Sequence, residues 1–279
     1  MRSNVAIVIR QMAERTTAAC LELLKEQAPA RNIIVIGEKP FSSAVRRTFE
    51  LGIESKQEWT LAVDADILVT PECIDELLQV AERLEDYFFG VQGKVLDKLY
   101  GVPRGGGPHL YRTKYLEKAL AFIPREGTSL RPESDTYDAM AAIGLHYYFG
   151  QEVYGLHDYE QSYCDLYRKG FLHAKKHWRY LAHFAKHWQA GSTADKDFSL
   201  ALLGLRAALE HTQPVLIDRD YFPSEVTDLL FSVGLAEKKE MSPPAAGYVR
   251  KTLAEYDESS SLKWFEAQNF DYIKRSDEL

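Results

Sequence analysis

The chain has 279 residues, of which 46% are hydrophobic and 27% are charged, and its formal net charge is −7. These values are ordinary for a globular protein with a sizeable core, and the acidic balance argues against a general nucleic-acid-binding protein. No apolar stretch approaches the about 20 residues of a transmembrane helix. The three cysteines, Cys20, Cys73 and Cys164, lie far apart, which excludes a disulfide framework and indicates a reducing compartment such as the cytoplasm.

The first third of the chain alternates between short apolar runs and amphipathic segments. We expect strands at 4–10, 32–38 and 58–69, and helices at 14–28, 42–54 and 70–86. The helix over 42–54 is expected to begin at Ser42 or Ser43 and to end at Gly52. Alternation of this kind predicts a parallel α/β sheet whose strands are covered on both faces.

Two carboxylates interrupt the third apolar run. We expect the strand to continue through Asp64 and Asp66, in which case both side chains share one face. If the strand ends there, they lie at its carboxyl edge, where open α/β sheets bind ligands. Neighbouring carboxylates repel each other unless a cation lies beside them, and their oxygens suit Mg²⁺ or Mn²⁺. Alternatively, both aspartates cap the following turn and helix.

The composition changes after the third helix. We expect strands and loops over 88–113, a short helix at 113–120, and a polar loop that runs into a helix at 125–144. From about residue 158 the pattern becomes mostly helical. The chain therefore divides into an α/β domain over 1–165 and a helical region over 166–279.

A glycine run lies within the second of these stretches. Gly105, Gly106 and Gly107 follow one another in 103–113, and we expect a loop there rather than regular structure. Three glycines remove every Cβ, so that the backbone can approach a ligand closely. The alternative is a tight turn that needs only positive φ angles.

Four stretches together resemble a known family. They are "VAIVIR", the second strand ending at Glu38, "VDAD" at 63–66, and "GGGPHLYRTKYLEKAL". Residues 4–120 are similar to nucleotide-sugar-dependent glycosyltransferases of the GT-A fold, in particular to the large inverting family with polysaccharide and rhamnosyl-type transferases. The resemblance implies a GT-A-like, Rossmann-like domain with a mostly parallel sheet, followed by a helical C-terminal region. It also implies a hexosyl-type transferase in polysaccharide biosynthesis.

The resemblance assigns donor-binding roles to several residues. Glu38 would contact the nucleoside, and Arg10 and Gln11 would line the base pocket. A basic residue on the next helix, Arg46 or Arg47, would face the diphosphate. For the two arginines a solvated helix face is the competing interpretation.

The resemblance also implies a metal and sugar site. Asp64 would hold the ribose or a metal-bound water, and Asp66 would bind Mn²⁺ or Mg²⁺ directly as the second aspartate of a DxD motif. His157 would complete the metal site, since imidazole is compatible with Mn²⁺. Gly106 and His109 would lie beneath the donor sugar.

Inverting sugar transfer needs a carboxylate that takes the proton from the acceptor hydroxyl. The family supplies it from an adjacent acidic pair at a helix start, and the comparable acids here are Glu133, Asp135 and Asp138. Ser134 separates the first two, which departs from the family pattern. We favour Asp135 as the base and place Glu133 second. A capping box on the following helix is the structural alternative.

The segment 166–194 is basic, aromatic and free of acidic residues. It holds two histidine pairs at i,i+4 spacing, His173 with His177 and His183 with His187, which resemble zinc ligands only weakly. A basic amphipathic helix can lie on an anionic membrane or hold an anionic acceptor. It can equally pack its aromatic residues on the catalytic domain.

We therefore expect a metal-dependent glycosyltransferase that moves a sugar from a nucleoside-diphosphate sugar to a hydroxyl of a glycan, a lipid-linked or a small-molecule acceptor. It would act in the cytoplasm or at the inner face of a membrane, without nucleic acid, and homo-oligomerisation is compatible with this. The alternatives are a retaining transferase, a nucleotidyltransferase and a non-catalytic scaffold of the same fold. A nucleotidyltransferase would carry a glycine-rich loop after the first strand, and residues 10–20 hold no glycine.

Overall fold

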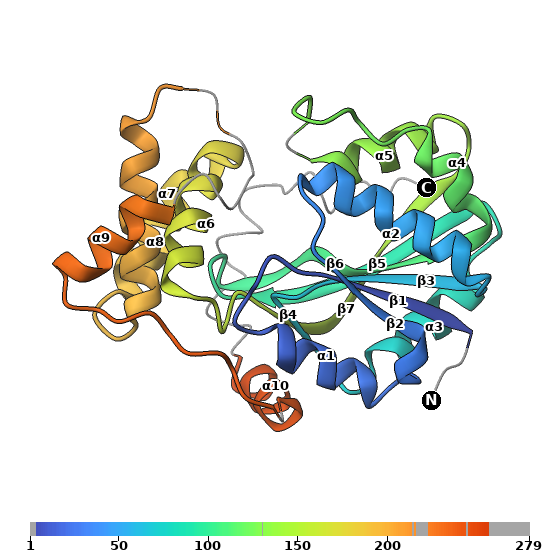
Figure 1. Ribbon diagram of the computed structural model, residues 1–279, viewed down its shortest axis with the longest axis horizontal. Coiled ribbons are helices and arrows are strands. Elements are labelled where there is room, and N and C mark those ends of the chain that lie inside the picture. The colour runs from blue at the N-terminus through green and yellow to red at the C-terminus, as the bar shows by residue number, and fades with distance from the viewer. Residues whose placement is uncertain (1–3, 130, 214, 216–222, 244, 257–279) are drawn as a thin grey trace.

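In the part of the chain that the structure describes, the protein is a mixed α/β molecule with one seven-stranded sheet and a group of helices beside it (Figure 1). The computed structural model describes residues 4–129, 131–213, 215, 223–243 and 245–256. The strands are β1 (Val5–Arg10), β2 (Ile33–Ile36), β3 (Trp59–Asp64), β4 (Ile67–Val69), β5 (Phe88–Asp97), β6 (Val102–Arg112) and β7 (His146–His157). Their order in the sheet is β2-β1-β3-β6-β5-β7-β4.

The sheet is mixed, so the expectation of a mostly parallel sheet is wrong. β1 runs parallel to β2 and β3, and β5 runs parallel to β7, but β6 is antiparallel to both β3 and β5, and β4 is antiparallel to β7. The reason is the short connection between β5 and β6. A connection this short can only join antiparallel strands, and the resulting hairpin inserts next to β3.

The third apolar run does not form one continuous strand. β3 ends at Asp64, residues 65 and 66 turn, and the chain resumes as β4. β4 pairs with β7 at the far edge of the sheet, whereas β3 pairs with β1 and β6. Asp64 and Asp66 therefore occupy the end of a strand and the turn beyond it, and they contact different partners.

The glycine run lies within a strand, so the expected loop is also a wrong prediction. β6 passes through Gly105, Gly106 and Gly107, opposite a register shift between Gln92 and Lys94 of β5. Gly106 and Gly107 have φ angles of +149° and +117°, which other residues rarely adopt. The glycines thus permit an irregularity inside the strand rather than a separate loop.

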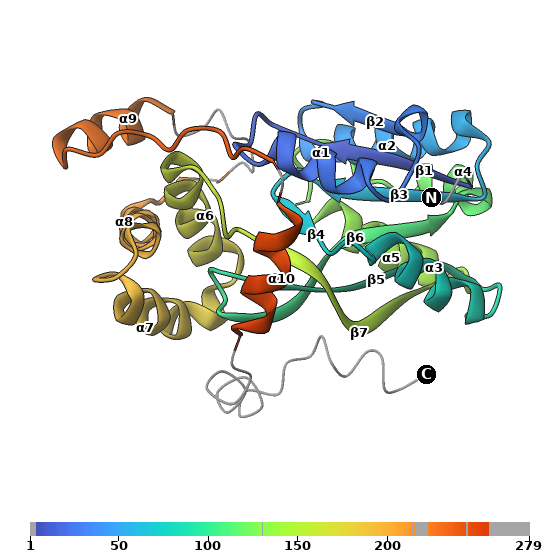
Figure 2. The ribbon, with the colours of Figure 1, turned by 90° about the horizontal axis from the view of Figure 1, so that it is seen from below.

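Helices cover both faces of the sheet (Figure 2). α1 (Thr17–Lys25) and α3 (Cys73–Arg83) pack on one face, and α2 (Phe41–Ser55), α4 (Leu116–Leu120) and α5 (Pro132–Ala141) pack on the other. Short 3₁₀ turns lie at Ala30–Asn32, Thr113–Tyr115 and Trp178–Tyr180. The expected helices are confirmed, with ends that differ by a few residues.

The expected boundaries of α2 are not those observed. Its N-cap is Pro40, without a side-chain cap, and the helix continues through Gly52 to Ser55. A Cβ on Gly52 would lie 2.4 Å from Thr60 Oγ1 and 2.7 Å from Leu116 Cδ1. Gly52 therefore serves the close approach of α2 to β3 and α4 rather than the end of the helix.

A second core lies among α6 (Tyr163–Lys176), α7 (Leu181–Gly191), α8 (Lys196–Glu210) and α9 (Pro223–Ser232). The aromatic residues of α7, Phe184 and Trp188, are buried there. α10 (Ala246–Ala254) returns to the sheet, where Val249 joins the core of α1 and α3. Within the residues described, no helix is both long and apolar enough to cross a membrane.

α7 holds the turn between β5 and β6 through its polar side chains. Trp188 Nε1 donates to Leu99 O at 2.7 Å, and the Nε2 atoms of His183 and His187 donate to the carbonyls of Tyr100 and Lys98 at 2.9 and 3.1 Å. This histidine pair thus serves to attach the helical group to the sheet.

Candidate active site

A large cleft opens at the carboxyl ends of β1 and β3 and extends to α5 and α6. Its volume is about 820 Å³, within the range of small-molecule sites. Nine of the predicted site residues line it: Arg10, Gln11, Glu38, Asp64, Asp66, Gly106, His109, Glu133 and His157. Parallel strands that end together bring these distant positions to one edge of the sheet.

Two predicted residues lie elsewhere. Arg47 is on the outer part of α2, where it pairs with Glu50 and Glu54. Asp135 is exposed on the first turn of α5 and does not line the cleft, although Glu133, two residues earlier, does. The two acids are about 200° apart around the helix axis, so Glu133 faces the cleft and Asp135 faces the surface.

Arg10 is the central residue on the β1 side of the cleft. Its Nε donates to Asp64 Oδ1 at 2.7 Å, and its Nη1 donates to Glu133 Oε1 at 2.6 Å. The side chain is 4% exposed, and its Nη2 is buried without a hydrogen-bond partner. Because buried donors are normally satisfied, Nη2 is an available donor for a ligand oxygen.

The two carboxylates bound by Arg10 differ in their electrostatics. Burial raises the pKa of Asp64, and the opposing effect of Arg10 does not overcome it. Burial also acts to raise the pKa of Glu133, but the charges of Arg10 and His109 have the larger effect and lower this pKa to about 2. Glu133 is therefore ionised at neutral pH although it is only 12% exposed.

A cluster of tyrosines and a histidine surrounds Glu133. Tyr111 Oη donates to Glu133 Oε1 at 3.1 Å, and His109 Nε2 lies 3.6 Å from Oε2. The Nδ1 of His109 is hydrogen-bonded to the hydroxyls of Tyr147 and Tyr137 at 2.8 and 3.1 Å, and those two rings stack at 3.9 Å. Burial lowers the pKa of His109, which keeps the ring neutral. These contacts fix the orientation of the carboxylate.

A second group of charges lies around Asp66. Lys169 Nζ on α6 donates to both Asp66 Oδ2 and Asp158 Oδ1. Of the remaining oxygens, Asp66 Oδ1 is buried and accepts no hydrogen bond, and Asp158 Oδ2 lies 3.2 Å from His157 Nδ1. Asp158 has a φ of +64°, a conformation that non-glycine residues rarely adopt and that is often found at functional sites.

Asp97 orients His157 toward Asp66. The Nδ1 of His157 lies 2.8 Å from Asp97 Oδ2 and donates to it, so its Nε2 faces Asp66 Oδ2 at 3.6 Å. Arg104 Nε donates to the same Asp97 oxygen at 2.6 Å. Burial opposes the charged imidazole, but Asp158 and Asp66 outweigh it and raise the pKa of His157 to about 9.

The residues present fit a divalent cation. Ligand atoms of Asp66, His157 and Asp158 lie within 4.8 Å of one another, the only group of this kind among the described residues. The buried Asp66 Oδ1 accepts no hydrogen bond, and two carboxylates with an imidazole that Asp97 orients suit Mn²⁺. Lys169 shares these carboxylates, so its ammonium must shift when a cation binds.

Sequence reasoning missed Asp158 and Lys169. Asp158 was detectable, because it directly follows His157 in the printed sequence. Lys169 lies one helix further on, and no spacing rule connects it with Asp66. Only the packing of α6 against the strand ends shows that contact.

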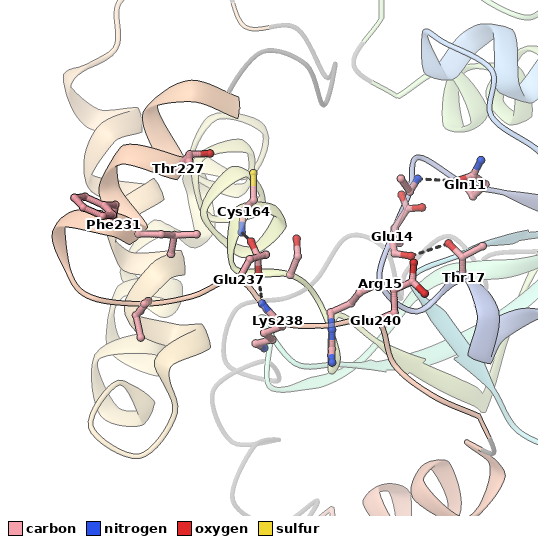
Figure 3. Close-up of a pocket in the computed structure, with 14 residues that line it drawn as sticks. Gln11, Glu14, Arg15, Thr17, Cys164, Thr227, Phe231, Glu237, Lys238 and Glu240 are labelled. Carbon is pink, nitrogen blue, oxygen red and sulfur yellow. Dashed lines mark hydrogen bonds between the residues drawn. The ribbon is translucent and has the colours of Figure 1, made fainter.

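A second cavity lies between α9 and the loop that follows β1 (Figure 3). Its charged groups serve structural contacts. Glu237 accepts hydrogen bonds from the backbone N–H groups of Tyr163 and Cys164 at the start of α6, and Arg15 pairs with Glu160 at 2.5 Å. Glu237 and Arg15 are therefore already paired within the protein, whereas the cleft at the strand ends contains buried polar atoms without a hydrogen-bond partner.

Comparison with known proteins gives weak structural likenesses only. No protein-family model matches the chain, and no curated protein matches it. A mannosyltransferase from Pyrobaculum calidifontis, solved with GDP-Man and Mn²⁺, is 12% identical over 83% of this chain and 79% of its own, with a TM-score of 0.41.

Other solved structures align over about half of the chain. A glycosyltransferase involved in the glycosylation of the major capsid of PBCV-1 is 13% identical over 53% of this chain and 81% of its own, with a TM-score of 0.37. The 2-C-methyl-D-erythritol 4-phosphate cytidylyltransferase from Francisella tularensis is 14% identical over 52% and 89%, also with a TM-score of 0.37. Likenesses at this level assign no function to the chain.

Proposed function

We propose that the protein is a metal-dependent glycosyltransferase that moves a sugar from a nucleoside-diphosphate sugar to an acceptor hydroxyl with inversion. One observation carries the proposal. The triad of Asp66, His157 and Asp158 lines the cleft at the strand ends, and so does the buried, ionised carboxylate of Glu133. Sugar transfer from a diphosphate needs both of these elements, one for the leaving group and one for the acceptor proton.

The β1 side of the cleft would hold the donor. Arg10 Nη2 is an unused buried donor, and Gln11 and Glu38 lie at the ends of β1 and β2, where they would contact the nucleoside. Asp64 would contact the ribose, and Gly106, which lines the same cleft, would lie beneath the sugar. Arg47, paired on the outer part of α2, has no part in this proposal.

Asp66, His157 and Asp158 would hold Mn²⁺ or Mg²⁺. The ion would supply neutralisation of the charge that develops on the departing diphosphate. Asp97 keeps the Nδ1 proton of His157 directed away from the site, so that Nε2 is the available ligand atom. Lys169, released from one of its carboxylates, would place its ammonium beside the diphosphate.

Glu133 would take the proton from the acceptor hydroxyl. It lies inside the cleft, ionised and oriented by Tyr111, whereas Asp135 points to solvent. The contact with Arg10 makes the carboxylate a weak base. A ligand oxygen that binds the guanidinium would weaken this contact and raise the basicity of Glu133.

The test is a thermal-shift panel of nucleoside diphosphates, each with and without Mn²⁺. A ligand at one hundred times its dissociation constant should add about 2.7 kcal/mol to the free energy of unfolding. We expect one nucleotide to stabilise the protein only with the metal. The variant Asp66→Asn should lose this effect, and Asp75→Asn, an exposed aspartate on α3, should keep it.

If no nucleotide shifts the melting temperature, the donor assignment is wrong. If one does, the anomeric configuration of the product, read by NMR with the matching sugar nucleotide, separates inversion from retention. A retained configuration would remove Glu133 as the acceptor base and favour the retaining alternative.

A further inference from the structure

The α6 side of the cleft is strongly basic. Five cationic side chains from three segments line it: Arg104, Arg131, Arg168, Lys169 and Lys176. Three of them have carboxylate partners. Arg104 pairs with Asp97, Lys169 pairs with Asp66 and Asp158, and Arg168 lies 3.5 Å from Asp165.

The other two cations have no carboxylate partner among the residues that the structure describes. Arg131 donates through Nη2 to His177 Nδ1 at 3.1 Å, a neutral acceptor. No hydrogen bond or ion pair involves the Lys176 ammonium within the same part of the chain. Burial, followed by the repulsion of Arg168 and Arg131, lowers the pKa of Lys176 to about 7. The two basic groups therefore meet without a carboxylate between them, and a bound anion would favour the charged form of Lys176.

Aromatic and imidazole rings line the cleft together with Arg131 and Lys176. The Nδ1 of His173 is buried without a hydrogen-bond partner and lines the same cleft. Tyr100 packs edge-on against the rings of His173 and His177, at centroid distances of 5.2 and 6.0 Å. Aromatic and imidazole surfaces next to two unpaired cations suit a ligand with one anionic group and a less polar body.

We propose that Lys176 and Arg131 bind a phosphate group carried by the acceptor. This inference rests on the proposed function, because the acceptor hydroxyl has to reach Glu133, and Arg131 lies two residues before Glu133 at the N-cap of α5. Lys176 lies seven residues after Lys169 on α6, about 10 Å along the helix axis. A phosphate at Lys176 is thus separate from a diphosphate beside Asp66 and Asp158.

The experiment compares two double variants by titration calorimetry with inorganic phosphate. Arg131→Gln/Lys176→Met removes the two unpaired cations. Arg125→Gln/Lys186→Met removes the same charge from exposed positions outside the cleft. We expect the first pair to weaken phosphate binding at least tenfold and the second to leave it within twofold of the wild type. Equal melting temperatures would show that both variants are folded.

A second arm separates the acceptor phosphate from the donor diphosphate. Affinity for the nucleoside diphosphate with Mn²⁺ should stay within twofold in both double variants. Equal phosphate affinity in the two pairs overturns the proposal, and so does a parallel loss of diphosphate affinity in Arg131→Gln/Lys176→Met, since the cations would then serve the donor. Absence of nucleotide binding in every protein contradicts the proposed function alone, because the phosphate arm still detects the anion site.

Discussion

At the scale of the residue, the contrast between Glu133 and Asp135 is decisive. Both are acids in the first turn of α5, and the sequence favoured Asp135. Two residues on a helix are about 200° apart around its axis, so they face opposite sides. Glu133 therefore meets Arg10 and Tyr111 in the cleft, and Asp135 meets solvent.

We predict that Glu133→Gln lowers kcat for sugar transfer by about 10²–10⁴, the usual effect of losing a general base. Asp135→Asn should change kcat less than twofold. Initial rates with the donor found in the nucleotide panel measure both values. Glu133→Gln should still bind that nucleotide, which would show that the loss concerns chemistry rather than folding. The opposite ranking of the two variants would restore Asp135 as the base.

His157 should make the stability of the metal-free protein depend on pH. Its pKa is raised in the folded state to about 9, above the ordinary value of 6.5. The folded state therefore binds the proton more tightly than the unfolded state. The resulting stabilisation is fully present below pH 6.5 and is lost as the pH rises through about 9, with a slope of up to about 1.4 kcal/mol per pH unit.

Urea unfolding in the presence of a chelator, from pH 6 to pH 9.5, measures this dependence. The variant His157→Gln should show a flatter profile over that range. His146→Gln is a control, because His146 lies at the start of β7, away from the carboxylates of the cleft. An equally steep fall in the His157→Gln protein would mean that other groups cause it.

At the scale of the element, the crossing of α6 and α8 relies on two glycines. A Cβ on Gly204 would lie 2.0 Å from Tyr167 O, and one on Gly170 would lie 2.2 Å from Ala201 O. Both obstacles are backbone atoms, which cannot move without displacing a helix. Glycine at these positions lets the helices approach closely, and α6 carries Lys169 and Lys176 to the cleft.

We predict that Gly204→Ala lowers the free energy of unfolding by about 1–3 kcal/mol, because the added methyl group overpacks the helix crossing. Gly247→Ala is the matched change on α10, where a Cβ would meet nothing within 4 Å. It should raise stability by about 0.5–1 kcal/mol through helix propensity. Thermal or urea unfolding compares the two, and a neutral Gly204→Ala would show that α6 and α8 can separate at little cost.

At the scale of the whole molecule, the basic aromatic segment 166–194 is divided between two helices that build the second core. Phe184 and Trp188 are fully buried in it. Trp178 is 68% exposed and lies at the corner between α6 and α7 next to Arg179. Most of the aromatic side chains that could have inserted into a membrane are thus packed inside the protein.

We therefore predict that this segment does not anchor the protein to membranes. In flotation with vesicles that contain phosphatidylserine, the protein should stay in the soluble fraction at physiological salt. If it floats, the variant Trp178→Ala/Arg179→Gln shows whether the exposed corner is responsible. Loss of flotation in that variant would support the membrane contact that the sequence suggested.

The local pattern of the sequence was sufficient for the first half of the sheet. The apolar runs of β1, β2 and β3 have the pattern of buried strands, and the segments of α1 and α2 have the periodicity of amphipathic helices. The structure confirms these five elements. The residue types at the ends of those strands also indicated the edge of the sheet at which the cleft lies. Arg10, Glu38, Asp64 and Asp66 do meet in one cleft, because parallel strands that share a register end at the same edge.

Only the tertiary structure decided the rest. The β5–β6 hairpin inserts beside β3, which makes the sheet mixed, and no periodicity in the sequence specifies the neighbour of a hairpin. The same holds for Lys169, which meets Asp66 across 103 residues, and for Arg10 and Glu133 across 123. Helical and strand periods report which face a side chain occupies, but contacts between faces arise from packing, which depends on the whole chain.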